Sequence, residues 1–152
     1  MTYHGPGQLV LYPILDLNHH GKDIHEYMRK LEEVVIVSLR KCCGIESYRI
    51  DGLTGVWIAN EKVAAIGVGM RRWISYHGVA INVDPDLKAF SHIVPCGISD
   101  HGVCSINSIL GSTAPQMNVI SNGVKEAFSE IFNLNLVEAP VFDDYKKMDL
   151  VD

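Results

Sequence analysis

The chain has 152 residues, 47% of them hydrophobic, and carries a formal net charge of -5. Its mean hydropathy is +0.11. This composition is typical of one globular domain, which we expect over residues 1–138, followed by a loosely held tail at 139–152. The negative charge gives no basic footprint for nucleic acid, and no apolar stretch is long enough to span a membrane. We therefore expect neither a nucleic-acid nor a membrane partner. No segment resembles a signal or transit peptide.

The four cysteines and seven histidines show no spacing typical of a disulfide framework or a zinc site. We therefore expect no metal. Gly67 and Gly69 begin a pattern that resembles a dinucleotide-binding fingerprint, but Arg72 stands where its third glycine should be. We accordingly expect no nucleotide-binding unit of that type and no cofactor.

Two helices are predicted by apolar residues at helical spacing. Asp23 and Glu26 have the spacing of an N-cap and an N3 residue, and the apolar periodicity after them continues to about Lys41. A second amphipathic pattern runs from Gln116 and is ended by Asn133. Asp84 and Pro85 favour a short helical turn around Leu87 and Phe90; the physical reason is that proline is tolerated at the first helical position.

Between these helices the sequence favours short strands. An apolar run at 8–17 predicts a strand that Pro13 bends, and residues 134–137 predict a closing strand. Asn60 and Glu61 predict the tight connection of a hairpin between 56–58 and 63–66. The remaining strand-like runs are 48–50, 55–59, 62–68 and 79–83. This order predicts an α/β or α+β sandwich with a mostly antiparallel or mixed sheet and flanking helices.

Cys96 is the candidate nucleophile. Pro95 before it and Gly97 after it predict a turn that can present a thiol at a cleft. The alternative is a small buried hydrophobic residue, which is how most free cysteines behave. Cys42, Cys43 and Cys104 are interpreted as structural.

Lys62 is the candidate activator, since it begins an otherwise apolar run that also holds the small residues Ala64, Ala65 and Gly67. A lysine near a thiol stabilises the thiolate, which is the reactive form, whereas an isolated strand-end lysine is usually solvated. Small residues on the same strand leave room for a substrate chain. This combination favours acyl transfer without a metal.

Two predicted loops, 2–8 and 75–80, share the triplet Tyr-His-Gly and place His4 and His77 in similar local sequence. Either imidazole could orient the thiol or carry a proton, because histidine titrates near neutral pH. The alternative is that glycine and proline only set the path of a turn, in which the histidine forms a hydrogen bond.

The chain resembles the lipoyl(octanoyl) transferases, also called octanoyl-acyl-carrier-protein:protein N-octanoyltransferases. The wording D-G-L-T-G-V-W with K-V-A-A-I-G is most similar to the plastid-type members of plants. The matching stretches are T-Y-H-G-P-G-Q-L-V at 2–10, T-G-V-W at 54–57, K-V-A-A-I-G-V at 62–68, W-I-S-Y-H-G-V-A-I-N-V at 73–83 and I-V-P-C-G-I at 93–98.

This resemblance implies a fold shared with biotin and lipoate protein ligases, and a Cys/Lys dyad of Cys96 and Lys62. It implies octanoyl transfer from octanoyl-acyl carrier protein to the lysine of lipoyl domains, in 2-oxoacid dehydrogenase complexes and the glycine cleavage H protein, through a cysteine acyl-thioester. The implied location is the plastid, with the mitochondrion or cytoplasm as alternatives. The residues implied in substrate binding are Thr2, Tyr3, His4, Ala65, Ile66, Gly67, His77, Gly78, Val79 and Ala80.

One departure separates the chain from the family pattern. The family carries an Arg-Gly-Gly triplet upstream of the Thr-x-His-Gly loop, preceded by several dozen residues of sheet, and here Met1 comes first. We therefore expect a chain that lacks the N-terminal part of the domain. Two alternative functions stay open: an ATP-dependent lipoate-protein ligase, and an inactive fragment that binds a lipoyl domain without modifying it.

Overall fold

Five antiparallel strands form one sheet in the spatial order β1-β5-β4-β3-β2, in a computed structural model that describes residues 4–92 and 101–138. The strands are β1 (Gln8–Leu11), β2 (Tyr48–Ile50), β3 (Leu53–Ile58), β4 (Glu61–Arg71) and β5 (Ile74–Asn82). The helices are α1 (Ile24–Cys43), α2 (Ile106–Leu110) and α3 (Met117–Phe132), with 3-10 turns η1 (Leu17–His19), η2 (Leu87–His92) and η3 (Gly111–Thr113). The expected α+β architecture is confirmed.

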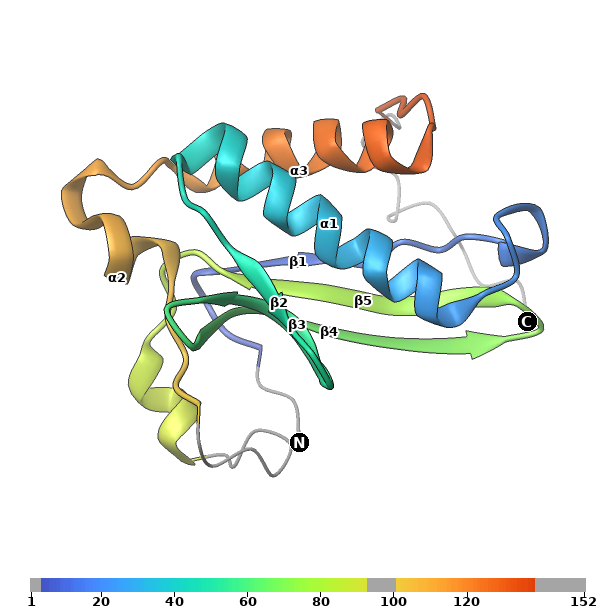
Figure 1. Cartoon of the computed structure of the whole chain (residues 1–152). Helices are drawn as coiled ribbons and strands as arrows, with labels where there is room; N and C mark the ends of the chain where they lie inside the picture. Colours follow the sequence, from blue (N-terminus) through green and yellow to red (C-terminus); the bar gives the residue numbers. More distant parts are fainter. Residues whose placement is uncertain (1–3, 93–100, 139–152) are drawn as a thin grey trace, which may run out of the picture.

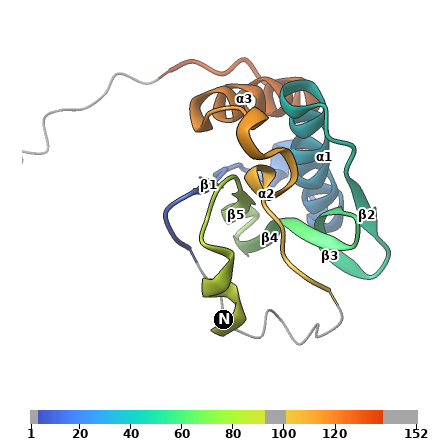
Figure 2. The same cartoon turned by 90° about the vertical axis from the view of Figure 1, so that its left-hand side faces the viewer.

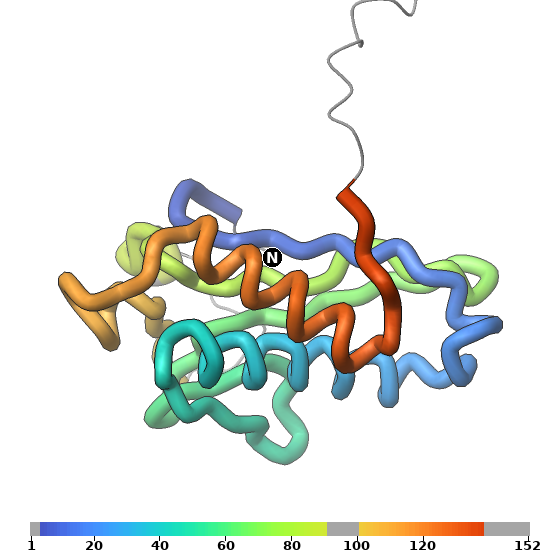
Figure 3. The backbone as a smooth tube through the Cα atoms, turned by 90° about the horizontal axis from the view of Figure 1, so that it is seen from above, coloured from blue at the N-terminus to red at the C-terminus, as the bar shows by residue number. Residues whose placement is uncertain are grey.

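Helices α1 and α3 lie on the same face of the sheet (Figures 1 and 2) and run antiparallel to each other across the strands (Figure 3). Tyr27 of α1 contacts Phe132 of α3 edge to face, with ring centroids 5.9 Å apart, and Phe132 stacks on Phe128 at 4.4 Å. Such aromatic pairs add to the stabilisation that burial of apolar surface supplies. The described residues therefore form a two-layer arrangement of helices on a sheet.

Both long helices begin and end near the residues that the sequence indicates. Asp23 is the N-cap of α1, and its carboxylate accepts hydrogen bonds from the N–H groups of Glu26 and His25. These bonds lower the pKa of Asp23, the one from Glu26 most. Asn133 ends α3 in the left-handed conformation, as predicted. The short turn after Pro85 is also confirmed, as η2.

The hairpin of β4 and β5 is longer than the sequence predicts. Residues 75–80, predicted as a loop, lie within β5 and pair with β4 from Met70↔Ser75 to Ala65↔Ala80. Glycine and histidine favour loops locally, but each residue of this segment pairs with a residue of β4, and this pairing overrides that preference.

Two further expectations about the connections were wrong. The turn between β3 and β4 uses Ala59 and Asn60, both with positive φ, instead of Asn60 and Glu61. No strand forms at 134–137, which the structure describes as irregular chain. The interruption expected at Pro13 is present: β1 ends at Leu11, and beyond the proline Asp16 forms an isolated bridge with Ile74. The tail at 139–152 lies outside the described residues.

The two faces of the sheet differ in character. Under the helices, alternate strand residues such as Ala64, Val79 and Ile81 join the hydrophobic core, with Leu9 and Leu11 packed against it. Residues one position along the strands face the other way, because successive side chains of a strand alternate. The face of β4 and β5 that points away from the helices is therefore the candidate face for a binding site.

Candidate active site

A strip of small residues forms the middle of the open face. Ala65 pairs with Ala80, and Gly67 pairs with Gly78, across β4 and β5. Ala65 and Gly67 on β4 are exposed, whereas their partners Ala80 and Gly78 are buried, and a Cβ added to Gly67 would meet no atom within 4 Å. The absence of bulky side chains leaves room for an extended apolar chain to lie along the strands.

Lys62 lies beside this strip on β4 and is half-buried. Its Nζ atom is 4.7 Å from the centre of the Trp57 ring, which is fully buried. A cation at this distance over an indole face is attracted to the ring. Gly55 also lies close to the lysine stem, since an added Cβ there would come within 3.2 Å of Lys62 Cε. Gly55 and Trp57 of β3 therefore form a slot that holds the Lys62 side chain.

The His101 ring also packs on Trp57, with ring centroids 5.1 Å apart. Trp57 Nε1 and His101 Nδ1 are both buried and have no hydrogen-bond partner among the residues that the structure describes. A buried polar atom without a partner is costly in an apolar interior, and in native structures it often marks a bound water, an ion or a catalytic role. Sequence reasoning missed both residues. The signal available for Trp57 was its place in the predicted hairpin, where it pairs directly with Lys62.

The peptide group of Lys62 also binds the chain that follows residues 93–100. Lys62 N donates to Gly102 O at 2.9 Å, and Cys104 N donates to Lys62 O at 3.1 Å, which pairs Lys62 with Val103 in parallel. The carboxamide of Asn82 donates to Cys104 O at 3.1 Å. The segment 101–104 is therefore anchored to β4 and β5 next to the lysine.

Aromatic and imidazole rings border the strip on the side of β1. His4 lies against Tyr12 with ring centroids 6.5 Å apart, and Tyr12 lies 6.3 Å from His77. Tyr76 packs on His77 at 4.9 Å and covers Gly69, whose added Cβ would overlap the Tyr76 ring. The two histidines of the repeated Tyr-His-Gly triplets are thus joined through Tyr12 at one edge of the open face.

The remaining site residues predicted from the sequence divide into two groups. Ile66 and Val79 pair with each other, and their side chains pack on the core side of the sheet, so they present only backbone toward a ligand on the open face. Thr2, Tyr3 and Cys96 lie outside the described residues. Their part in the site stays a prediction.

Two of the other cysteines are poorly suited to nucleophilic chemistry. Burial raises the pKa of Cys43 and Cys104 to about 11, and the negative charge of Glu61 adds to the effect on Cys104. A thiol with such a pKa carries very little thiolate at neutral pH. Cys42 also has a raised pKa, mainly through burial.

Within residues 4–92 and 101–138, no three His, Cys, Asp or Glu side chains gather in a way that could hold a metal ion. Neither of the long helices in that part of the chain has an apolar stretch of the length needed to cross a bilayer.

Comparison with known proteins identifies the family. The family model of the lipoyl protein ligase A/B catalytic domain matches residues 1–132, which is most of the chain. The chain belongs to this family. Among curated relatives, it is 44% identical to the chloroplastic octanoyltransferase LIP2p2 of Arabidopsis thaliana, covering 93% of this chain and 54% of that protein. It is 52% identical to an octanoyltransferase of Synechocystis sp., covering 87% of this chain and 57% of that protein.

This member of the lipoyl protein ligase A/B family therefore spans little more than half the length of these relatives. Solved structures confirm the fold shared with biotin and lipoate ligases. One contains a bi-partite lipoate protein ligase and its E2 lipoyl domain from Thermoplasma acidophilum, with a TM-score of 0.69, 21% identity, and coverage of 93% of this chain and 57% of that chain. Another is a biotin protein ligase from Aquifex aeolicus, with a TM-score of 0.65, 17% identity, and coverage of 84% and 53%.

Proposed function

We propose that this chain carries the acyl-transfer centre of an octanoyltransferase, which moves an octanoyl group from a carrier-protein thioester to a lysine of a lipoyl domain. The observation that carries the proposal is Lys62, which lies against Gly55 and Trp57 and on the same strand as the exposed small residues Ala65 and Gly67. The names of relatives at 44% and 52% identity support the acyl group. The named donor is octanoyl-acyl carrier protein, and the acceptors are lipoyl domains of 2-oxoacid dehydrogenase complexes and the glycine cleavage H protein.

In the proposed reaction the Cys96 thiolate attacks the thioester carbonyl. A carbon–sulfur bond to Cys96 forms, the bond to the carrier thiol breaks, and that thiolate takes up a proton as it leaves. The uncharged amine of the acceptor lysine then attacks the acyl-thioester, loses a proton, and returns Cys96 as the thiol. Amide formation from a thioester is downhill, so the transfer consumes no ATP. Backbone N–H groups near Cys96 would stabilise the oxyanion.

Lys62 would act on Cys96 through its charge. An ammonium a few ångströms from a thiol favours the thiolate. Only five residues separate Cys96 from Gly102, whose carbonyl accepts the Lys62 N–H. Six residue steps of fully extended chain span at most about 20 Å, so the covalent connection allows the two side chains to meet. The rings of His4 and His77 lie where they could carry protons at the edge of the strip.

The Ala/Gly strip would receive the eight-carbon chain. Each methylene that leaves water contributes about 0.8 kcal/mol, so an octanoyl chain gains more from such a strip than a short acyl group does. The strip is formed by the predicted binding residues Ala65–Gly67 and Gly78–Ala80, which pair with each other. A plastid location is proposed on the basis of the chloroplastic relative.

The alternative is an ATP-dependent lipoate-protein ligase, in which Lys62 contacts an acyl-adenylate and Cys96 has no role. One solved structure with this fold is a lipoate-protein ligase A bound with ATP, at 18% identity and a TM-score of 0.63. The higher identity of the relatives named octanoyltransferases favours the thioester route.

Intact-mass measurement after incubation with octanoyl-acyl carrier protein tests the proposal. We expect an octanoyl adduct on the wild-type chain and on Cys42→Ala, and none on Cys96→Ala. Addition of a lipoyl domain should move the octanoyl group to the domain without ATP. An adduct that persists in Cys96→Ala would remove the cysteine assignment. Pyrophosphate release from ATP with free octanoate would favour the ligase, and binding of the lipoyl domain without any transfer would favour an inactive fragment.

A further inference from the structure

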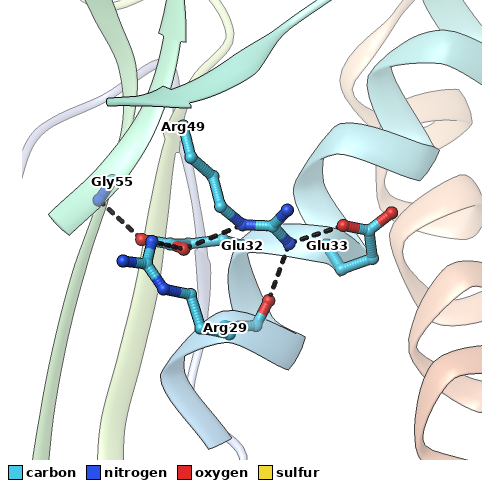
Figure 4. A network of polar contacts seen from close by, with 5 residues as sticks. All are labelled: Arg29, Glu32, Glu33, Arg49 and Gly55. Carbon is cyan, nitrogen blue, oxygen red and sulfur yellow. Dashed lines mark hydrogen bonds and ion pairs between the residues drawn. The ribbon is translucent and has the colours of Figure 1, made fainter. Parts of the chain in front are cut away.

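A buried carboxylate lies on the helix side of the sheet, directly behind the slot that holds Lys62. Glu32 of α1 is 1% exposed. Its Oε2 accepts hydrogen bonds from Arg29 Nη1 at 2.8 Å and from Arg49 Nε at 3.0 Å, and its Oε1 accepts the Gly55 N–H at 3.0 Å (Figure 4). The two arginines balance the charge of the carboxylate, which would otherwise be costly to bury.

The bond to Gly55 is made where the strand pairing is irregular. Leu53 and Trp57 pair with β2 across a register shift, and Val56 and Trp57 pair with β4 across another. Gly55 lies between these pairs, so the Glu32 carboxylate satisfies an N–H group at the irregular point of the sheet. Gly55 has φ +135°, a conformation that favours glycine.

Gly55 in turn faces the lysine. A Cβ on Gly55 would come within 2.8 Å of Ala64 O and 3.2 Å of Lys62 Cε, so the strand backbone touches the lysine stem at this point. Two residues further along β3, the Trp57 ring lies 4.7 Å from Lys62 Nζ. One carboxylate therefore holds the strand that supplies both residues, Gly55 and Trp57, that lie against Lys62.

We propose that Glu32 is a positioning residue for Lys62: by accepting the Gly55 N–H, its carboxylate sets the position of β3 and hence the place of the Lys62 ammonium. Glu32 touches neither the substrate nor Cys96 in this assignment, and acts through Gly55 and Trp57. The inference rests on the proposed Cys96/Lys62 pair, because the position of Lys62 matters for the reaction only if Lys62 activates the thiol.

The neighbouring Glu33 provides a matched control. It is an adjacent glutamate of the same network, and it accepts a hydrogen bond from Arg49 Nη2 at 2.5 Å, but its hydrogen bonds in the described residues do not include Gly55. Its side chain is 40% exposed. Glu32→Met and Glu33→Met therefore make the same chemical change in the same ion-pair network, and only the first removes the acceptor for Gly55.

The test follows the rate of iodoacetamide alkylation of the Cys96 peptide against pH, by mass spectrometry, in chains whose fold is checked by circular dichroism. Lys62→Ala tests the proposed pair and should move the inflection to higher pH by about one unit. Glu32→Met should move it in the same direction by about half a unit or more. Glu32→Gln keeps an acceptor for Gly55 and should restore most of the wild-type profile, and Glu33→Met should leave it unchanged.

Each outcome decides one of the two claims. If Lys62→Ala leaves the profile unchanged, the Cys96/Lys62 pair fails and the role of Glu32 fails with it. If Lys62→Ala moves the profile but Glu32→Met does not, only the role of Glu32 is overturned. A shift as large in Glu33→Met as in Glu32→Met would overturn it too, because the ion pairs and not the Gly55 bond would then be responsible. Should Glu32→Met fail to fold, Glu32→Asp withdraws the carboxylate by one methylene and should give the same upward shift.

Discussion

Substitution of Gly67 by leucine separates the proposed acyl strip from the stability of the fold. A Cβ added at this position would meet no atom within 4 Å, and Gly67 is exposed on β4, so the larger side chain can extend toward solvent. The sheet should tolerate the change, and the unfolding free energy should stay the same or rise by up to about 1 kcal/mol, because glycine weakens a strand. The melting temperature, measured by circular dichroism, checks this part.

The same leucine occupies the place of the substrate chain. Its four side-chain carbons exclude roughly three methylenes of an octanoyl group from the strip, at about 0.8 kcal/mol each. The loss of about 2.5 kcal/mol corresponds to a roughly 70-fold lower kcat/KM. Gly67→Ala adds one carbon and should cost about fourfold by the same reasoning.

The assay compares octanoyl and butanoyl donors at equal carrier-protein concentration. The octanoyl donor should lose activity in Gly67→Leu, and the butanoyl donor, which is too short to reach along the strip, should lose little. Equal losses for both donors, or no loss for the octanoyl donor in a folded variant, would refute the strip as the acyl site.

Three other outcomes are expected. Gly7→Ala should lower the melting temperature by about 10 °C, because an added Cβ would overlap the Asp84 carbonyl and the backbone has φ +87°; a melt within two degrees of wild type would contradict this. At pH 8, iodoacetamide should leave Cys43 and Cys104 largely unmodified, since burial raises the pKa of each to about 11, and peptide mapping after a short reaction checks it. Two backbone N–H groups lower the pKa of Asp23 below 3.8, so its charged form stabilises the fold above that pH and the effect is lost as the pH falls through the folded-state pKa; the difference in melting temperature between wild type and Asp23→Asn should therefore shrink in acid.

The helices could be predicted from the sequence because their signals are local. The Asp23 cap, the apolar periodicity that follows it, and the left-handed Asn133 are set by residues within a few positions of each other. The strands were harder. Residues 75–80 form a strand only because β4 pairs with them, and the single sequence carries no information on that register.

The candidate site, like the fold, could be predicted from the sequence only where its signals are local. Lys62 stands out as a charge on an apolar strand, and its nearness to a small-residue strip follows from the sequence of β4 alone. His101 and Glu32 come to the site from two other segments, through a parallel pairing and a helix packed behind the sheet. Contacts of this kind depend on the assembled fold, so no local pattern indicates them.

The attachment of Gly102 and Cys104 to the main chain of Lys62 simplifies genetic dissection of the site. Both bonds use the peptide N–H and carbonyl of residue 62, which every amino acid except proline retains. Exchanging the lysine for alanine, methionine or arginine therefore removes or reshapes the charge while the anchor of the downstream segment keeps its partners. Kinetic defects in such variants can be assigned to the missing ammonium and not to a detached chain.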